Sequence, residues 1–227
     1  MIIITDYNPL SSYRKTHNGA SVGLDFGLKT YLTASDGNNI VSPLFFKIFQ
    51  NKVKKQNKRL SKAQRRSNNR KRRLFELQQT YRKIRNLRND FQWKLAHELC
   101  KQYDFIFLET LNIESMKHLW GKKISDLSHS EFISKLMYIA TKYGVIVHQI
   151  DRWYPSSKTC ECGFINKNLS LIDRTWCCPK CGSINNRDFL ASKNILRKGI
   201  SELESKSNSS DSNIGVSCVC IQESHTV

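Results

Sequence analysis

The chain has 227 residues, 39% of them hydrophobic, and a formal net charge of +18. That length suffices for one sizeable domain, or for one domain with a small insert. The sequence shows no signal pattern at its start and no run near the ~18 apolar residues that span a bilayer, so a cytosolic protein is expected. The excess positive charge makes a polyanionic partner the first hypothesis.

The positive charge is concentrated in one segment. Between Lys47 and Arg88 there are 17 Lys or Arg residues and one acid, Glu76, which accounts for +16 of the +18. A solvated helical face would explain such a run, but a block of like charges repels itself unless phosphates neutralise it. We therefore expect nucleic-acid contact here. The predicted contacts are Lys54, Lys55, Lys58, Arg59, Arg65, Arg66, Arg70, Lys71, Arg72 and Arg73.

Three strands and a long basic helical segment are predicted after a polar lead over residues 1–20. Residues 21–27 and 30–34 alternate like strands, and a third strand begins at Ile40 after the hairpin signal at 36–37. Residues 46–102 are helical in composition, with a break at 67–69 that can cap a second helix. An apolar stripe in that helix predicts a buried face, made of Leu74, Leu77, Tyr81, Ile84, Leu87, Phe91, Leu95 and Leu99.

The second half of the chain adds two strands, an insert and two helices. Residues 103–109 and 145–150 are typical of buried strands, and residues 130–143 of a helix that Gly144 ends. A turn-rich, cysteine-bearing insert follows, and then a helix over 187–196. From about residue 201 the Ser/Asn/Glu-rich composition predicts disorder. This order predicts an α/β fold, with a mixed sheet flanked by helices.

Three acids far apart along the chain are candidate ligands for divalent metal ions. Asp25 lies within an apolar strand, where an uncompensated charge is costly. Glu109 ends a strand, which is where α/β sheets usually place their sites, and Asp188 opens a helix. Each has a simpler explanation, as a turn residue, a loop edge or a helix cap. Together they match the carboxylate set with which paired Mg²⁺ ions cleave phosphodiesters.

Two cysteine pairs predict a structural zinc site in the insert. They are Cys160-Glu161-Cys162-Gly163 and Cys178-Pro179-Lys180-Cys181-Gly182, and four thiolates in two pairs fit tetrahedral zinc. Free cysteines are the alternative. The first pair is one residue shorter than the usual C-x-x-C, so Cys177 is a candidate substitute ligand. Cys100 is expected in the core, and no role is assigned to Cys218 and Cys220.

These motifs, in this order, resemble the TnpB/OrfB family of insertion-sequence-encoded proteins, relatives of the compact type V CRISPR nucleases. The resemblance covers about residues 21–199. Val-Gly-Leu-Asp-Phe-Gly-Leu at 22–28 resembles the first RuvC motif of the family, Leu-Glu-Thr-Leu-Asn-Ile at 108–113 the second, and Arg187-Asp188 with Asn194-Ile195 the third. Residues 67–73 resemble its basic segment, and residues 152–160 and 174–182 the entry into and exit from its zinc ribbon.

The resemblance implies an RNase H-like (RuvC) mixed sheet with an inserted zinc ribbon. The nuclease core would span 21–152, the ribbon 153–185, a final helix 186–200 and a disordered tail 201–227. Mg²⁺ would be held by Asp25, Glu109 and Asp188, and Zn²⁺ by Cys160, Cys162, Cys178 and Cys181. The implied function is a transposon-encoded DNA endonuclease guided by RNA from the transposon end, in a prokaryotic nucleoid, with base pairing reading the sequence.

Three departures from the family pattern leave other functions open. About twenty residues precede the first motif, so the chain is expected to lack the long N-terminal half that binds guide RNA and reads a motif beside the target. The first cysteine pair is short, and Asn186 and Leu190 stand where the family has an acid and an asparagine. The alternatives are a nucleic-acid-binding remnant that cannot cut, a transposase that joins DNA strands, and a structural zinc protein.

Overall fold

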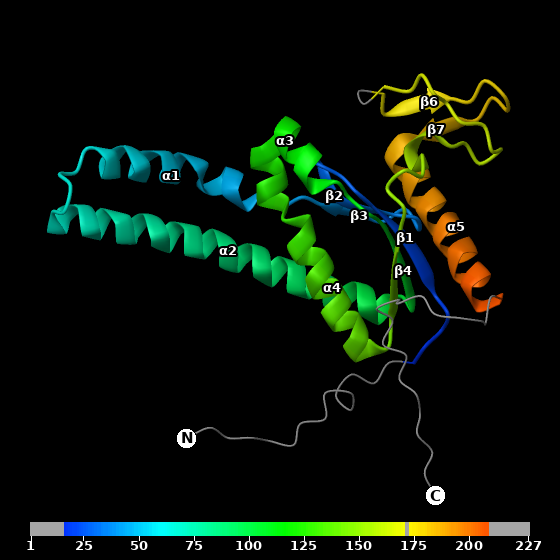
Figure 1. The fold of residues 1–227 in the computed structure, drawn as a ribbon, viewed down its shortest axis with the longest axis horizontal. Coiled ribbons are helices and arrows are strands. Elements are labelled where there is room, and N and C mark those ends of the chain that lie inside the picture. The colour runs from blue at the N-terminus through cyan, green and yellow to red at the C-terminus, as the bar shows by residue number, and fades with distance from the viewer. Residues whose placement is uncertain (1–15, 171–172, 209–227) are drawn as a thin grey trace, which may run out of the picture.

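The computed structural model describes residues 16–170 and 173–208, which form a mixed five-stranded sheet with helices on both faces (Figure 1). The strand order is β3-β2-β1-β4-β5. Strand β2 is antiparallel to β1 and β3, whereas β4 is parallel to β1 and β5. All five predicted strands are confirmed, with the bounds β1 Ser21–Phe26, β2 Thr30–Ala34, β3 Asn39–Val41, β4 Phe105–Glu109 and β5 Ile146–Ile150.

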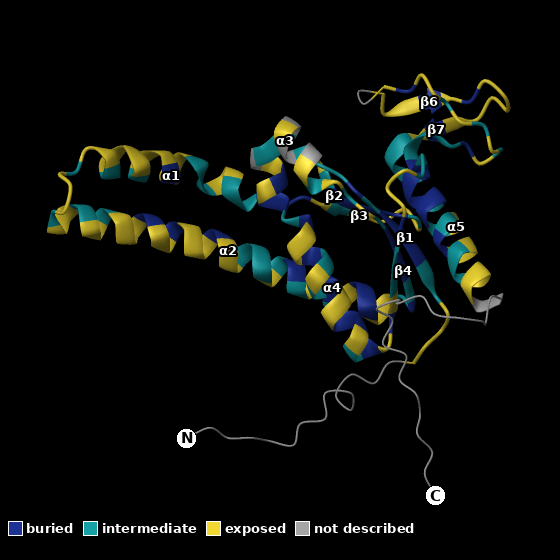
Figure 2. Ribbon diagram, viewed as in Figure 1, coloured by how far each residue is buried: buried dark blue, intermediate teal, exposed yellow. Residues whose placement is uncertain are grey.

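The main hydrophobic core lies on one face of this sheet. Alternate residues of β1 and β4, such as Leu24 and Leu108, point to this face because side chains alternate along a strand. The inner part of α2 (Asn68–Gln102) and α4 (His129–Tyr143) cover it, and the ribbon of their buried residues is dark blue in Figure 2. Helix α4 ends at Gly144, whose φ of 67° is left-handed, as predicted.

Helix α5 (Arg187–Asn208) covers the opposite face of the sheet (Figure 1). It packs so closely that a Cβ on Gly23 would clash with the Ser192 carbonyl, and a Cβ on Gly199 with the Phe107 ring. The helix is longer than the predicted 187–196, and residues 201–208 are helical, not disordered. Leu203 packs against the Phe107 cluster, and tertiary contacts of this kind hold a polar segment in a helix that composition does not predict. The predicted tail beyond residue 208 lies outside the described residues.

Helices α1 (Phe45–Ser61) and α2 form an antiparallel hairpin that extends away from the sheet, here called the arm (Figure 1). Val53, Leu77 and Ile84 form its small core. Leu74 and Tyr81 of the predicted stripe are instead exposed, because α1 covers this part of α2 along one side only. Although α2 has 35 residues, neither it nor any other described helix is apolar enough to cross a membrane.

The tip of the arm is closed by hydrogen bonds between its two helices. The Ser67 hydroxyl accepts the Arg70 N–H at 3.1 Å and caps α2, which confirms the predicted break. Arg70 Nη1 and Arg73 Nη1 donate to the carbonyls of Leu60 and Arg59, at 3.0 and 2.6 Å. Two of the predicted phosphate contacts therefore also satisfy carbonyls at the end of α1.

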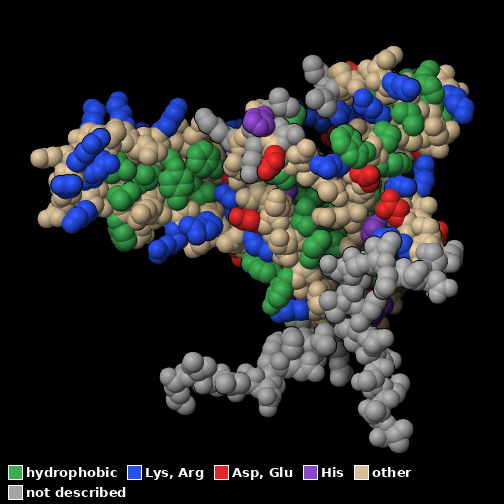
Figure 3. Space-filling model, viewed as in Figure 1, with side chains coloured by type: hydrophobic (Ala, Val, Ile, Leu, Met, Phe, Trp, Pro, Cys, Tyr) green, Lys and Arg blue, Asp and Glu red, His purple; other side chains and the backbone are tan. Residues whose placement is uncertain are grey.

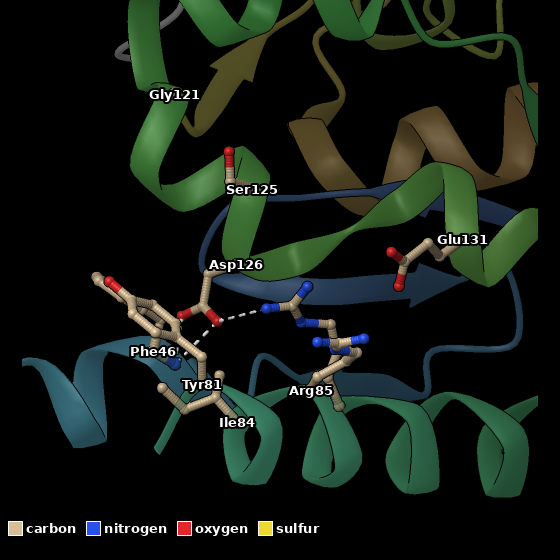
Figure 4. Close-up of a pocket in the computed structure, with 9 residues that line it drawn as sticks. Phe46, Tyr81, Ile84, Arg85, Gly121, Ser125, Asp126 and Glu131 are labelled. Atoms are coloured by element: carbon tan, nitrogen blue, oxygen red, sulfur yellow. Dashed lines mark hydrogen bonds and ion pairs between the residues drawn. The ribbon is translucent and has the colours of Figure 1, made fainter. Parts of the chain in front are cut away.

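Asp126 fixes the root of the arm. It lies near the end of α3 (Ile113–Leu127), a helix kinked at Trp120 that the sequence did not predict. Its buried carboxylate accepts the Phe46 N–H at 2.9 and 3.0 Å (Figure 4). The same carboxylate lies 3.9 Å from Arg88 Nη2. Because the first N–H groups of a helix have no partner within it, this carboxylate stabilises the start of α1.

Candidate metal centres

Strands β1 and β4 place two of the three predicted acids side by side. Leu24 pairs with Leu108 in parallel register, so the residues that follow them, Asp25 and Glu109, are neighbours on the same face of the sheet. It is the face that α5 covers, since Gly23 and Phe107, two residues earlier on each strand, contact that helix. Glu109 is the last residue of β4, at its carboxyl end, as predicted.

Helix α5 brings the third acid to the same region. Asp188 lies one turn before Ser192, and Ser192 lies against Gly23. One helical turn rises about 5.4 Å, close to the rise of two strand residues, so Asp188 is brought near Asp25. Burial raises the pKa of Asp25 well above its usual value, and the charges of Glu109 and Asp188 raise it further. The three carboxylates therefore interact electrostatically.

Two side chains from the insert contact these acids. The Ser156 hydroxyl donates to Glu109 Oε2 at 3.2 Å, and Arg174 Nη1 donates to both carboxylate oxygens of Asp188, at 3.0 and 2.9 Å. Among the described residues, the four insert cysteines form the one group of possible ligands whose atoms all lie within 4.8 Å of one another. The three acids are thus neighbours, but Asp188 is turned toward Arg174 and their oxygens do not form a compact set of metal ligands. As a set of carboxylate oxygen donors, they suit a hard cation such as Mg²⁺.

A hollow of about 380 Å³ opens beside Asp188. Its lining is mostly polar and includes Thr33, Asn39 and Asn186. Thr33 pairs with Asp25 across β1 and β2, so the hollow borders the acids on the side away from β4. A larger cavity of about 510 Å³ at the root of the arm, shown in Figure 4, is lined by none of the three acids.

The insert brings the four predicted zinc ligands together. Sγ of Cys160 lies 3.6 Å from Sγ of Cys181, and Sγ of Cys162 lies 3.6 Å from Sγ of Cys178. Tetrahedral zinc with Zn–S bonds of about 2.3 Å separates its sulfurs by about 3.8 Å, so the donor set fits this metal. The first cysteine pair precedes the small hairpin of β6 (Thr175–Cys177) and β7 (Ile184–Asn186), and the second pair lies in the loop between these strands.

The short C-x-C pair reaches this cluster through a tight turn. The Gly163 N–H donates to the Cys160 carbonyl at 2.9 Å, and the Gly182 N–H to the Cys178 carbonyl at 2.8 Å. Both glycines have positive φ, at 83° and 71°, which residues with a Cβ rarely adopt. The missing residue therefore shortens the first turn without removing either cysteine from the cluster.

Cys177 lies outside the cluster. It is exposed, and its Sγ is 3.4 Å from the Gly182 carbonyl oxygen, because Trp176 takes the inward position of β6. The Ser183 hydroxyl, in contrast, lies 3.3 Å from Cys160 Sγ and 3.2 Å from Cys181 Sγ. Burial opposes ionisation of Cys160, but hydrogen bonds from Ser183 and the backbone lower its pKa to about 6. Cys100 is buried in the main core, as predicted, and Cys218 and Cys220 lie outside the described residues.

The ten predicted nucleic-acid contacts all lie on the arm. Eight are exposed, and the other two are the partly buried Arg70 and Arg73 at its tip. Lys and Arg side chains are spread along the visible face of the arm in Figure 3. Acidic groups are sparse there, since Glu76 is the one acid between Lys47 and Arg88.

Comparisons of the sequence with known proteins identify relatives of this chain. Residues 7–119 match the OrfB_IS605 family, described as "Probable transposase", and residues 129–195 match the TNB domain of Cas12f1-like proteins. A "Putative RNA-guided DNA endonuclease" of Streptomyces pristinaespiralis is 32% identical over 184 residues, which are 80% of this chain and 46% of that protein. "TnpB-like protein L79" of Acanthamoeba polyphaga mimivirus is 30% identical over 217 residues, which are 88% of this chain and 41% of that protein.

The fold also has a solved counterpart. The structure of a Cas12f1–sgRNA–target DNA complex matches with a TM-score of 0.56 at 20% identity, covering 77% of this chain and 49% of that one. At this identity the match shows a shared fold. The chain spans about half the length of the curated relatives it matches. The two family models match successive parts of the chain, and the relatives above are 32% and 30% identical to it. The chain therefore belongs to the TnpB/OrfB family of insertion-sequence-encoded proteins.

Proposed function

We propose that this chain is the nuclease part of an RNA-guided, metal-dependent DNA endonuclease of TnpB type. Its sheet would be RNase H-like (RuvC), with the insert as a zinc ribbon. The observation that carries the proposal is the convergence of three acids from β1, β4 and α5, two of them on adjacent parallel strands. Support also comes from relatives that are named as RNA-guided DNA endonucleases.

The acids would act by positioning divalent cations. Bound Mg²⁺ ions would activate the attacking water and stabilise the leaving oxygen of the phosphodiester. Asp25 and Glu109 lie on neighbouring strands of a rigid sheet, which fixes the direction of their carboxylates. Asp188 would turn from Arg174 to complete the set, and Arg174 would then be free to pair with a phosphate.

The ribbon would hold its own side chains against the acids. Zinc bound by Cys160, Cys162, Cys178 and Cys181 would cross-link two loops that have little hydrophobic core of their own. Those loops carry Ser156 and Arg174 to Glu109 and Asp188. In this proposal the zinc is structural, and its loss would disturb the acid site indirectly.

The arm would bind phosphates of a guide–target duplex. Exposed lysines and arginines on one long projection can follow a nucleic-acid backbone without reading its sequence. The solved Cas12f1 structure is a complex with both an sgRNA and target DNA. We propose the same two classes of partner here, with the guide derived from the transposon end.

Cleavage assays on Asp25→Asn test this proposal. The full chain, combined with RNA transcribed from the neighbouring transposon end, is incubated with matching DNA in Mg²⁺ or in EDTA. We expect Mg²⁺-dependent cleavage that Asp25→Asn abolishes while nucleic-acid binding is retained. Asp90→Asn is the matched control, because Asp90 is an exposed acid paired with Lys94 in α2. Cleavage that Asp25→Asn leaves unchanged would reject the metal assignment.

A second function, binding without cleavage, is favoured by one observation. Arg174 neutralises Asp188 in this structure, and Asn186 replaces an acid two residues earlier. Wild-type protein that binds guide and target but does not cut in Mg²⁺ would indicate such a remnant. A joined DNA product in the same assay would instead indicate strand transfer.

A further inference from the structure

Trp153 is 80% exposed, in the turn that links β5 to the insert. Single apolar residues on a surface are ordinary, but tryptophan offers the largest flat apolar face of any side chain. The position of Trp153 in the fold therefore decides whether its exposed ring is suited to binding a ligand. Two features of that position, a fixed backbone and closeness to Glu109, point to a ligand.

The backbone around Trp153 is held in place from both ends. The Trp153 N–H donates to Asp151 Oδ1 at 3.1 Å, and the Tyr154 N–H donates to the Asp151 carbonyl at 3.2 Å. Further along, the buried amide of Asn194 in α5 donates to the carbonyls of Ser156 and Thr159, at 2.7 and 2.6 Å. The exposed ring thus projects from a fixed turn, which lowers the entropy cost of binding.

Both ends of this turn contact Glu109. Ile150, the last residue before it, pairs with Glu109 in the β4–β5 ladder. Ser156, near its far end, donates its hydroxyl to the Glu109 carboxylate at 3.2 Å. Trp153 lies between these two contacts along the chain, so its turn borders the sheet edge that carries the acids.

Arg152 gives this turn a positive charge. Its guanidinium carbon lies 5.4 Å from the centre of the Trp153 ring, a cation–π distance. A flat aromatic face beside an arginine is the combination that binds single-stranded nucleic acids, with the ring stacking on a base and the cation near a phosphate. Bases within a duplex are already stacked on one another, so an unpaired base is the ligand that fits.

We propose that Arg152 and Trp153 form a stacking site for an unpaired nucleobase of the strand that enters the acid-bearing edge. This inference rests on the proposed nuclease function and adds the contact that holds the strand. Stacking accepts any base, so the site would position the strand without reading its sequence. Trp153 would act as a binding and positioning residue, with no part in the chemical step.

Binding measured without cleavage tests the site. In an Asp25→Asn background, affinities for short DNA and RNA single strands of one sequence, and for the matching duplex, are measured by fluorescence anisotropy. Trp153→Ala should weaken binding of a single strand about 5- to 100-fold, the usual loss per stacked base. Trp153→Phe should retain most of the affinity, because phenylalanine keeps a flat face. Duplex affinity should not change, since it depends on the arm.

The control variant is Ile184→Ala. Ile184 is 82% exposed on the ribbon, so it matches Trp153 in exposure but has no aromatic ring. A loss with the DNA strand identifies the strand to be cut as the ligand, and a loss with RNA alone identifies the guide. Equal affinities of Trp153→Ala and the parent for every single strand would overturn the proposal, as would an equal loss for the duplex. Cleavage by Asp25→Asn would refute the metal assignment of the proposed function and leave this binding result standing.

Discussion

Gly23 of β1 lies directly against the Ser192 carbonyl of α5, with no room for a Cβ between them. This contact sets how closely the helix packs on the sheet, and Asp188 lies one turn before it. The position of the third acid relative to Asp25 therefore depends on the absence of a side chain at residue 23.

Gly23→Ala should destabilise the protein and displace Asp188. The added methyl group meets backbone atoms of Ser192 and Leu196, which cannot give way as a flexible side chain would. Overpacking of this kind costs about 1–3 kcal/mol, which urea unfolding can measure. Gly121→Ala is the control, because a Cβ there meets nothing within 4 Å. Equal stability of Gly23→Ala and wild type would show that α5 is free to move away from the sheet.

Cys178→Ser should lose bound zinc, whereas Cys177→Ser should keep it. The two residues are adjacent, but Cys178 belongs to the four-sulfur cluster and Cys177 faces outward. Zinc content after dialysis, measured by mass spectrometry, is about one ion per chain if the cluster binds zinc. A full zinc complement in Cys178→Ser, with loss in Cys177→Ser, would make Cys177 the ligand.

Replacing Lys54, Lys55 and Lys58 with glutamine should weaken nucleic-acid binding and reduce its dependence on salt. All three are exposed on α1, away from the hydrogen bonds that close the tip of the arm. Each lost phosphate contact lowers the slope of log affinity against log salt by about 0.9, so the triple variant should lose up to about 2.7. Lys94→Gln, which removes a lysine paired with Asp90, is the control. An unchanged slope would place the nucleic acid elsewhere.

His129 should make the fold less stable in mild acid. Its ring is buried beside Phe26 and Tyr31, and neither nitrogen has a hydrogen-bond partner among the described residues. Burial lowers the pKa of His129 to about 4, so between pH 6.5 and 4 the unfolded chain takes up a proton that the folded chain excludes. Stability therefore falls as pH falls through this range, by about 2 kcal/mol between pH 7 and pH 5.

Urea unfolding of wild type and His129→Leu at both pH values measures this effect. Leucine cannot ionise, so the variant should lose about 2 kcal/mol less than wild type on going from pH 7 to pH 5. Comparing the two proteins cancels other acid effects, including protonation of the cysteines. Parallel losses in both proteins would show that His129 is not the source.

The sequence predicted the elements that depend on local patterns. The five strands have alternating or continuously apolar sequences. Ser67 caps the start of α2, and Gly144 caps the end of α4. Helix α3 was missed, because Gly121 interrupts its sequence and the helix is kinked at Trp120. The last two turns of α5 were predicted to be disordered, since the contact of Leu203 with the Phe107 cluster has no local signal.

The acids and cysteines were found from the sequence, but their surroundings were not. Asp25 lies within an apolar strand and Glu109 ends one, and a carboxylate in such a place stands out even without a structure. Ser156 and Arg174 were not selected as site residues, because the acids they contact lie 47 and 14 positions away along the chain. Likewise, the exposure of Trp153 depends on how its turn is held by Asn194 of α5.

Mn²⁺ binding tests most directly whether Asp25, Glu109 and Asp188 share divalent cations. Mn²⁺ stands in for Mg²⁺ and can be followed by electron paramagnetic resonance on zinc-loaded protein, without any need for cleavage. We predict that wild type and Asp90→Asn bind Mn²⁺ alike, and that Asp25→Asn lowers the affinity at least about tenfold with its zinc content and fold intact. Equal Mn²⁺ affinity in wild type and Asp25→Asn would contradict a shared cation site at these acids.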